Sequence, residues 1–375
     1  MSRIHVCLVS DQPIPTLTTV LQLKPDGVIL LKTSEMDEKA AFLMDILAAK
    51  KVKASSERIE AYDINDVIRV SESVIKKCSD CEVSLNITGG TKIGTLGTFQ
   101  AFYTSGKPIY YVDTKSNRIL KLFPEKEQAE YPINVTISIK DYLEAYGFQV
   151  TSHVKDDSYI YARKTLTHYL AHTVAHDEKI IASLNGRLHA YDSNSSLPIS
   201  LALPGNHKLL SHITLLKGVT RRDDGSIEIQ EYDALRYLKG IWFEEYVYLT
   251  AKDAGADEVW LNIEGRWLTK GKYQPKNEFD VMISKGNRLF YISCKTANPD
   301  RITEGDAEGV GRHYLYELDS LSDKALGLFG KKMLASARRI DDPAIRERAK
   351  VLGIDLIDGK NIIMLKDTLK QWLRK

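Results

Sequence analysis

Two neighbouring segments in the last third of the chain carry acidic, hydroxyl and amino side chains at a spacing of two residues. Glu278 and Asp280 lie in one strand-like run, Ser293 and Lys295 lie in the next, and Lys285-Gly286-Asn287 forms a turn between them. Because residues i and i+2 of a strand share a face, a hairpin would gather two carboxylates, a hydroxyl and an ammonium on one side. Such a group suits a divalent metal and a phosphate. The structural alternative is a solvated polar face on an edge hairpin.

The composition is that of a globular protein with no apolar stretch long enough to cross a bilayer. The chain has 375 residues, of which 43% are hydrophobic, and this length predicts two domains. Four scattered cysteines form no disulfide framework, and the first residues enter a strand-like run instead of a signal peptide, so we expect a cytoplasmic protein with no membrane partner. The net charge of +2 requires any nucleic-acid contact to come from local patches.

Short apolar runs and helical patterns alternate between residues 4 and 115. Apolar residues recur at helical spacing in three segments, 35–50, 65–79 and 91–105. The predicted strands are Ile4–Val9, Gly27–Leu31, Arg58–Tyr62, Val83–Ile87 and Ile109–Val112. This alternation predicts an α/β domain with a parallel, Rossmann-like sheet covered by helices on both faces. Ligands of such sheets bind beyond the carboxyl ends of the strands, where the strand order reverses.

Two polar loops follow the first and fourth predicted strands. The first contains Ser10, Asp11 and Gln12, and the second is Asn86-Ile-Thr-Gly-Gly-Thr-Lys92, which leads into a helix. Two glycines at a helix N-terminus allow a close approach of an anion to backbone N–H groups. Asp11 would repel phosphate, so we expect it to meet a base edge or a ribose hydroxyl. A tight turn with a helix cap is the structural alternative for the second loop.

These two loops, in a Rossmann-like domain, resemble the CRISPR-associated Rossmann fold, or CARF, domain. With the C-terminal segment described below, the whole chain resembles the CARF nucleases that act as ancillary effectors of type III CRISPR systems. The resemblance implies a homodimer in which a cyclic oligoadenylate, most often cyclic tetra-adenylate, binds across two CARF domains and activates the nuclease. The residues that it implies for this pocket are Ser10, Asp11, Gln12, Gly89, Gly90, Thr91, Lys92 and Thr114.

The C-terminal part is predicted to contain a helix, a strand, the hairpin and another helix, in that order. The helix from Gly240 carries Glu244 and Glu245, and the strand Glu258–Glu264 follows it. This order, with Gly-x-x-x-Glu on the first helix, resembles the PD-(D/E)xK restriction-endonuclease-like fold, an α/β domain with a mixed sheet. Glu245 points about 100° away from Glu244 on a helix and is expected to be solvated.

The resemblance to this nuclease fold implies roles for individual side chains. Asp280 would be the central ligand of a Mg²⁺ or Mn²⁺ ion, and Glu244 would support the metal site. Lys295 would polarise the scissile phosphate or the attacking water. The family pattern has an acidic residue or glutamine where this chain has Ser293, and a hydroxyl is a poor ligand for a hard cation. Either Glu278 takes over this role as a metal ligand, or Ser293 is an inactivating replacement and the domain binds without cutting.

The predicted boundaries are a CARF domain at 1–145, a connecting region at 146–235 and a nuclease domain at 236–375. The alternation of Ile133–Ile139 predicts a strand. Arg163 and His168 have the Arg-x4-His spacing of HEPN ribonucleases, which is too short a pattern to carry a function. His168, His172 and His176 share one helical face without an obvious fourth ligand, so a polar stripe is expected there.

The expected activity is cleavage or nicking of DNA, with RNA not excluded and with little sequence specificity. Basic residues that could track phosphates cluster at Lys270, Lys272, Lys276, Lys331, Lys332, Arg338, Arg339, Arg346, Arg348 and Lys350, although such runs are commonly a solvated face. Two alternatives remain. One is a catalytically impaired sensor, for which Ser293 is the reason. The other is a ring nuclease that degrades the cyclic messenger in the CARF pocket, with help from Lys92 and Ser10.

Overall fold

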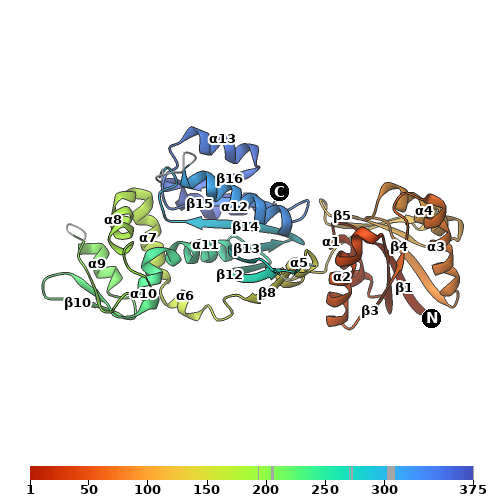
Figure 1. Ribbon diagram of the computed structural model, residues 1–375, viewed down its shortest axis with the longest axis horizontal. Coiled ribbons are helices and arrows are strands. Elements are labelled where there is room, and N and C mark those ends of the chain that lie inside the picture. Colours follow the sequence, from red (N-terminus) through yellow and green to blue (C-terminus); the bar gives the residue numbers. More distant parts are fainter. Residues whose placement is uncertain (193, 204–206, 270, 272, 302–308, 375) are drawn as a thin grey trace.

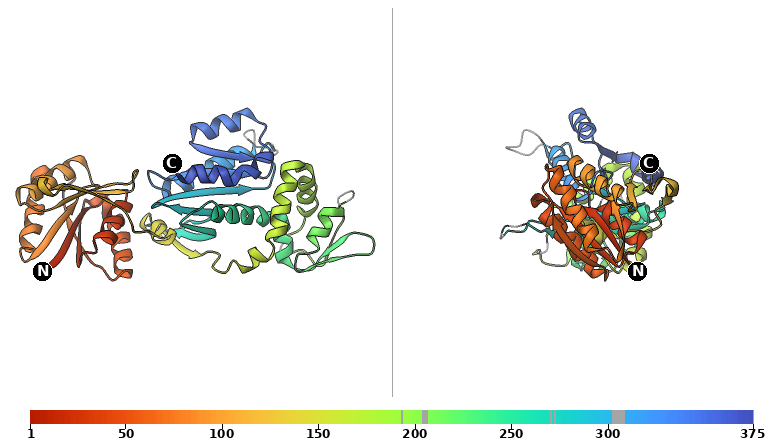
Figure 2. Two further views of the ribbon diagram at one scale, coloured as in Figure 1. Left: turned by 180° about the vertical axis from the view of Figure 1, so that it is seen from behind. Right: turned by 90° about the vertical axis from the view of Figure 1, so that its right-hand side faces the viewer.

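The protein is elongated, with two sheet-based domains and a helical region following one another along its long axis (Figures 1 and 2). The computed structural model describes residues 1–374 apart from 193, 204–206, 270, 272 and 302–308. The N-terminal domain lies at one end, the second sheet lies in the middle, and the helical region lies at the other end. The carboxyl ends of the N-terminal strands face the second domain, because the loop after the first strand contacts Leu328.

The N-terminal domain is built on a seven-stranded sheet in the order β3-β2-β1-β4-β5-β6-β7. The first five strands are parallel, and β6 and β7 are added antiparallel. Its elements are β1 (Ser2–Leu8), α1 (Ile14–Leu23), β2 (Gly27–Lys32), η1 (Ser34–Met36), α2 (Asp37–Ala49), β3 (Lys53–Arg58), α3 (Ile64–Lys77), β4 (Cys81–Asn86), α4 (Lys92–Thr104), β5 (Ile109–Asp113), β6 (Arg118–Phe123), η2 (Glu125–Glu127) and β7 (Ala129–Pro132). The strand order reverses at β1, so a crevice is expected between the loops that follow β1 and β4.

The C-terminal domain is built on a six-stranded mixed sheet in the order β16-β15-β14-β13-β12-β8. Strands β14, β15 and β16 are parallel, and β8, β12, β13 and β14 pair antiparallel. Its elements are α5 (Ile139–Ala145), β8 (Phe148–Ser152), α11 (Trp242–Asp253), β12 (Glu258–Trp267), β13 (Lys276–Lys285), β14 (Arg288–Lys295), α12 (Val310–Ala325), β15 (Lys331–Ser336), α13 (Pro343–Val351), β16 (Ile354–Asp358), η4 (Gly359–Met364) and α14 (Leu365–Arg374). The α/β class predicted for both domains is confirmed.

The helical region lies within residues 153–241 and packs its apolar side chains into the same core as α11. Its elements are α6 (Ser158–Ala162), α7 (Lys164–His176), α8 (Glu178–Leu188), β9 (Ile199–Leu201), α9 (His207–Ile213), β10 (Val219–Arg221), β11 (Ile227–Ile229), α10 (Tyr232–Arg236) and η3 (Tyr237–Ile241). The predicted connecting region began at residue 146, and β8 in that range is the edge strand of the second sheet.

The predicted strand at Arg58–Tyr62 is wrong, because the strand is β3, which ends at Arg58. Strand β3 lies at the edge of the sheet and is partly exposed, so its sequence Lys-Ala-Ser-Ser-Glu-Arg contains no apolar run. Ile59, an apolar residue within the predicted strand, is buried just beyond the end of β3. Polar edge strands give little local signal for this reason.

The predicted strand at Ile133–Ile139 is also wrong, because this segment pairs with no strand in the described part of the chain and α5 begins at Ile139. Its isoleucines alternate because Ile133, Ile137 and Ile139 are buried as the chain passes from one domain to the other. Side chains of the second domain accept hydrogen bonds from two of its N–H groups. Asn287 Oδ1 accepts a hydrogen bond from Ile137 N at 2.8 Å, and Glu258 Oε2 accepts one from Ile139 N at 2.8 Å.

The expectation that Glu245 is solvated is wrong. Its side chain is fully buried and accepts hydrogen bonds from Arg163, with Nε at 3.0 Å from Oε2. Helix α11 is covered on two sides, by the second sheet and by α7, so the face 100° from Glu244 meets another helix. Arg163, which carried the HEPN-like spacing, thereby has a structural role as the partner of a buried carboxylate. Within the described residues, no helix is long and apolar enough to span a membrane.

Candidate active site and ligand pocket

The hairpin of β13 and β14 brings Asp280 and Ser293 together as the two-residue spacing predicted. Asp280 Oδ2 accepts a hydrogen bond from the backbone N of Cys294 at 2.7 Å and another from Ser293 Oγ at 3.2 Å. Val281 pairs with Ile292, so Asp280 and Ser293 follow in register at the end of the hairpin away from its turn. The carboxylate of Asp280 is therefore held in one orientation by the neighbouring strand.

Ser293 is buried and donates to Asp280, so its hydroxyl orients the carboxylate. The backbone N–H of Cys294 makes the shorter contact with the same oxygen. Replacement of an acidic residue by serine at this position leaves one carboxylate fewer and one hydrogen-bond donor more beside Asp280. This arrangement keeps Asp280 pointed into the site.

Glu244 enters the site from α11 and is half-buried. Burial, with repulsion from the carboxylates of Asp280 and Glu278, raises the pKa of Glu244 to about 8. Burial also raises the pKa of Asp280, although Lys295 and the hydrogen bonds from Cys294 and Ser293 oppose this shift. These carboxylates thus destabilise one another when all are ionised, and a cation among them would relieve the repulsion.

Glu278 lies in β13 on the same side as Asp280 but is exposed. It lines a cavity of about 650 Å³ together with Arg266 and Lys276. Glu264 of β12 stands directly opposite in the strand register. Burial and the charges of Asp280 and Glu264 raise the pKa of Glu278. Glu278 therefore lies at the border between the buried carboxylates and an open groove.

Lys295 lies between Asp280 and a carboxylate that the sequence did not indicate. Its Nζ is 3.9 Å from Glu317 Oε2 and 5.1 Å from the centre of the Tyr314 ring, both on α12. Burial lowers the pKa of Lys295, but Asp280 and Glu317 outweigh burial, so that the net pKa is raised. Lys295 therefore keeps its proton and its positive charge at neutral pH. Glu317 and Tyr314 lie three residues apart and so share one face of α12. The sequence alone could not link them to the site, because it does not show that α12 packs beside Lys295.

The residues at this site fit a divalent cation held by few protein ligands. Among the described residues, no three histidine, cysteine, aspartate or glutamate side chains lie close enough together to ligate one ion. Magnesium is commonly bound by one or two carboxylates, with waters and substrate phosphates completing its shell. Glu244 and Asp280 offer two carboxylates whose pKa values are raised by burial, which fits such a site.

The basic residues late in the chain are mostly engaged in ion pairs. Lys332 pairs with Asp319 and Asp323, and Arg346 pairs with Asp358. The other pairs are Arg338 with Glu178, Arg339 with Asp341 and Lys350 with Glu347. Lys270 and Lys272 lie outside the described residues. Because they are engaged in these ion pairs, most of the late basic residues are better explained by a structural role than by contacts with the phosphates of a nucleic acid.

A cavity of about 370 Å³ lies where β1 and β4 end, at the reversal of strand order. Its lining includes six predicted residues, Ser10, Asp11, Gln12, Gly89, Gly90 and Thr114. Glycine is needed at position 89, because a Cβ there would lie 2.5 Å from the carbonyl oxygen of Leu8. Tyr111, which the sequence did not single out, exposes 40% of its side chain and lines the same cavity. An exposed aromatic ring beside a glycine loop suits the stacking of a nucleobase.

Two predicted pocket residues, Thr91 and Lys92, do not line this cavity. Thr91 caps α4, because its Oγ1 accepts a hydrogen bond from Gly94 N at 3.0 Å and donates to Ala61 O at 2.9 Å. Lys92 begins α4 and is exposed. Thr91 therefore has the contacts of a helix cap, which was the structural alternative to an anion site for this loop.

The cavity extends from the N-terminal domain to the turn of the candidate catalytic hairpin. Asn287, in the turn between β13 and β14, lines it together with Leu328 and Tyr146. Gln12 Oε1 accepts one hydrogen bond from Tyr146 Oη at 3.0 Å and another from Leu328 N at 3.0 Å. Asn287 is buried and donates to Val135 O at 2.9 Å. One end of the hairpin thus contacts the pocket, while its other end carries Asp280 and Lys295.

Comparison with protein families finds one match in each of the two sheet-based domains. The Card1 CARF domain family matches residues 4–142, and the Card1-like endonuclease domain family matches residues 231–375. The chain combines a Card1 CARF domain with a Card1-like endonuclease domain. The family resemblance noted in the sequence is thereby confirmed. A comparison with curated proteins gives no match.

Solved structures share this fold over most of the chain. Protein VC1899 from Vibrio cholerae is 23% identical with a TM-score of 0.87, covering 99% of this chain and 98% of that one. Can2 from Sulfobacillus thermosulfidooxidans, solved with cyclic tetra-adenylate, is 24% identical with a TM-score of 0.80 and 99% coverage of both chains. A type III CRISPR defence DNA nuclease activated by cyclic oligoadenylate is 16% identical with a TM-score of 0.58, covering 92% of this chain and 46% of that one. At these levels of sequence identity, the similarity shows that these proteins share the fold of this chain.

Glu244→Gln is expected to stabilise the metal-free protein at alkaline pH. The pKa of Glu244 is raised from 4.5 to about 8, so between these values the folded protein keeps a proton that the unfolded chain has lost. Stability therefore falls as pH rises across this window, and glutamine removes this contribution. We expect the melting temperature of Glu244→Gln to exceed that of the wild type by roughly 2–4 °C at pH 8.5 and to match it at pH 4.5. An equal difference at both pH values would contradict the assignment.

Ser293→Ala tests how much the hydroxyl of Ser293 contributes to cleavage by orienting Asp280. Cys294 N still holds the carboxylate in this variant, so cleavage is expected to fall by less than roughly 30-fold, the loss of one hydrogen bond to a charged group. Asp280→Asn serves as the comparison and should abolish cleavage. Initial rates of plasmid nicking measure both. A Ser293→Ala variant as inactive as Asp280→Asn would show that the hydroxyl has a larger role than positioning.

Proposed function

We propose that this protein is a metal-dependent nuclease that a cyclic oligoadenylate activates in CRISPR antiviral defence in the cytoplasm. The observation that carries the proposal is the cavity at the ends of β1 and β4, which also contacts the turn of the hairpin bearing Asp280 and Lys295. The matches to a Card1 CARF domain and a Card1-like endonuclease domain support the same function. Can2, with the same fold, was solved with cyclic tetra-adenylate, so we propose this messenger.

Two attachments carry the effect of the messenger from the pocket to the active site in this proposal. The first is Gln12, whose side-chain oxygen is bonded to Tyr146 and to the amide of Leu328 in the connection from α12 to β15. The second is Asn287, which fastens the hairpin turn to Val135 and Ile137. Helix α12 carries Glu317 and β14 carries Lys295, so a ligand that moves either attachment changes the surroundings of Lys295. An effector acts by contacting two states differently, and these contacts offer that difference.

A homodimer is part of the proposal because the pocket of one chain is small. Its volume of about 370 Å³ lies near the lower end of pockets for drug-sized molecules. A ring of four nucleotides is larger than such a molecule. We propose that two chains face each other at these cavities and share the ring, as the resemblance to CARF nucleases implied.

The chemistry assigned to this chain's residues follows from their charges. Glu244 and Asp280 would hold a Mg²⁺ or Mn²⁺ ion with Glu278 beside them, and such an ion supplies an activated water and charge stabilisation for phosphodiester hydrolysis. Lys295 keeps its proton because Asp280 and Glu317 raise its pKa against the effect of burial. Its ammonium would stabilise charge that develops on the phosphate. Glu317 and Tyr314 would keep that ammonium in place.

The proposed substrate is DNA, bound in the groove beside Glu278 that Arg266 and Lys276 line. No base-reading motif is visible in the sequence, so little sequence specificity is expected. The catalytically impaired sensor remains the alternative, because Ser293 stands where the PD-(D/E)xK pattern has an acidic residue or glutamine. The hydrogen bond from Ser293 to Asp280 favours an intact site over an impaired one.

The function is tested by incubating the protein with supercoiled plasmid, single-stranded DNA or RNA, with and without cyclic tetra-adenylate and Mn²⁺. We expect plasmid cleavage only when both are present, and Lys295→Ala should lower the rate by about 10²–10³ while DNA binding stays within a few-fold. The polymer and the messenger are followed in the same reaction. Messenger loss without metal would instead indicate a ring nuclease, and binding of both ligands with no reaction would indicate a sensor. A Lys295→Ala variant as fast as the wild type would contradict the role of Lys295.

Tyr146→Phe tests the route from pocket to active site, because it removes only the hydroxyl that donates to Gln12. Burial raises the pKa of Tyr146, so this hydroxyl keeps its proton and donates. The ratio of cleavage rates with and without messenger should fall roughly fivefold, the factor that corresponds to one neutral hydrogen bond of about 1 kcal/mol. The matched control is Tyr62→Phe on the exposed surface. An unchanged ratio in Tyr146→Phe at saturating messenger would exclude this route.

A further inference from the structure

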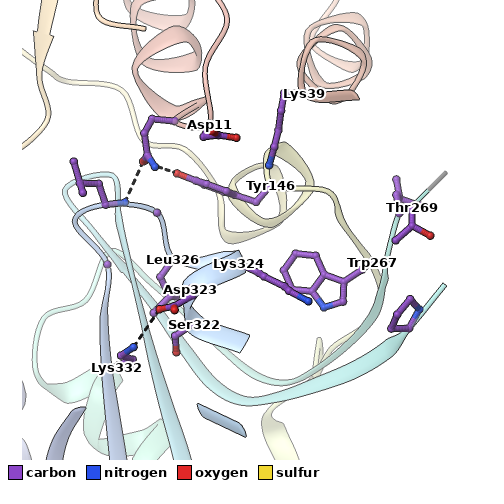
Figure 3. Close-up of a pocket in the computed structure, with 16 residues that line it drawn as sticks. Asp11, Lys39, Tyr146, Trp267, Thr269, Ser322, Asp323, Lys324, Leu326 and Lys332 are labelled. Atoms are coloured by element: carbon purple, nitrogen blue, oxygen red, sulfur yellow. Dashed lines mark hydrogen bonds and ion pairs between the residues drawn. The ribbon is translucent and has the colours of Figure 1, made fainter. Parts of the chain in front are cut away.

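A second and larger cavity lies between the CARF domain and the endonuclease domain (Figure 3). Its volume is about 810 Å³, within the range of small-molecule sites. The CARF domain contributes Asp11 and Lys39 to its lining. The endonuclease domain contributes Trp267 at the end of β12, and Ser322 and Lys324 from α12.

This cavity is separated from the messenger pocket by side chains that line both. Asp11, Gln12, Tyr146 and Leu328 line both cavities, and hydrogen bonds from Tyr146 Oη and Leu328 N to Gln12 Oε1 join three of them. The dashed line at Tyr146 in Figure 3 marks its hydrogen bond to Gln12. A molecule in the larger cavity would therefore touch the same four residues from the opposite side.

Two lysines from different domains lie over aromatic rings in this cavity. Lys39 Nζ lies 5.7 Å from the centre of the Tyr146 ring, and Lys324 Nζ lies 5.9 Å from the centre of the Trp267 ring. Within the described part of the chain, neither lysine has a carboxylate at ion-pair distance. A third lysine, Lys332, is already paired with Asp319 and Asp323. An anionic group that enters the cavity would thus meet two ammonium groups available to it.

A buried hydroxyl also lacks a partner on the wall of this cavity. Ser322 is 3% exposed, and its Oγ has no hydrogen-bond partner among the described residues. Buried polar atoms are normally hydrogen-bonded, so an orphaned one beside a cavity indicates that something outside the chain completes it. Figure 3 places Ser322 next to Asp323 at the lower wall. Asp11 on the opposite wall is the remaining carboxylate, and it can accept a hydrogen bond from a ribose hydroxyl or a base amine.

We propose that this inter-domain cavity is a second ligand site, distinct from the messenger pocket, and that it binds a single nucleoside phosphate. The phosphate lies between Lys39 and Lys324, the base stacks against the Trp267 and Tyr146 rings, and Ser322 and Asp11 take polar groups of the base or ribose. A mononucleotide meets both lysines and both rings at once, which inorganic phosphate or a nucleoside alone does not. Because its contacts come from both domains, its occupancy would bias their relative position.

The site is tested by isothermal titration of the full-length protein with ATP, AMP, adenosine and inorganic phosphate, without metal or cyclic messenger. ATP or AMP should bind saturably and more tightly than adenosine or phosphate. Lys39→Ala and Lys324→Ala should each weaken this binding by roughly tenfold or more, the loss of one charge-assisted hydrogen bond. Lys76→Ala, an exposed lysine on α3, is the matched control and should leave binding unchanged. Thermal melting of each variant checks its fold.

A separate titration with cyclic tetra-adenylate distinguishes this site from the messenger pocket. Lys324→Ala should bind the cyclic messenger as the wild type does, since Lys324 does not line that pocket. Absence of saturable nucleotide binding, or binding that Lys324→Ala leaves intact, would overturn the proposal. So would binding of single-stranded DNA but not of mononucleotides at this place. None of these results bears on whether the messenger activates cleavage, so the two proposals fail independently.

Discussion

The hairpin of β13 and β14 is fastened at both ends, and the rest of the molecule is arranged around this constraint. At its turn, the buried amide of Asn287 bonds to Val135 and Ile137, where the chain leaves the CARF domain. From Asp280 to Lys285 an extended strand covers about 17 Å. Beyond Lys295, Asn185 of the helical region bonds to Thr296 O at 3.1 Å. A paired and buried hairpin of this kind moves as a unit, so contacts at its turn bear on the site at its far end.

Repulsion among buried and partly buried carboxylates is the main electrostatic feature of the candidate active site. Burial and mutual repulsion raise the pKa values of Glu244, Asp280 and Glu278, while Lys295 is shared between Asp280 and Glu317. One ammonium cannot neutralise four carboxylates. A divalent cation would relieve this imbalance, and the same imbalance raises the affinity of these carboxylates for protons. In the proposed function, the site gives up some stability of the metal-free protein in exchange for binding a cation and a phosphate.

Local periodicity predicted the elements that contain the site but not the contacts between them. The two-residue spacings of β13 and β14 placed Asp280 beside Ser293, because side chains alternate along a strand whatever surrounds it. Periodicity also placed Glu245 on a different face from Glu244, but it could not show that α7 covers that face. Glu317, Tyr146 and Asn287 have contact partners far away in sequence, so no local pattern indicated these contacts. Polar edge strand β3 was missed because its side chains are partly exposed.

Hydrogen exchange of the backbone amides, followed with and without cyclic tetra-adenylate, measures most directly whether the CARF pocket controls the hairpin. The amide of Leu328 donates to Gln12, and residues 285–288 form the turn that Asn287 fastens. Our account predicts that the messenger changes exchange in residues 326–330 and 285–288 as well as in the loops after β1 and β4. Changes confined to residues 1–115, with the turn and the α12–β15 connection unaffected, would contradict it.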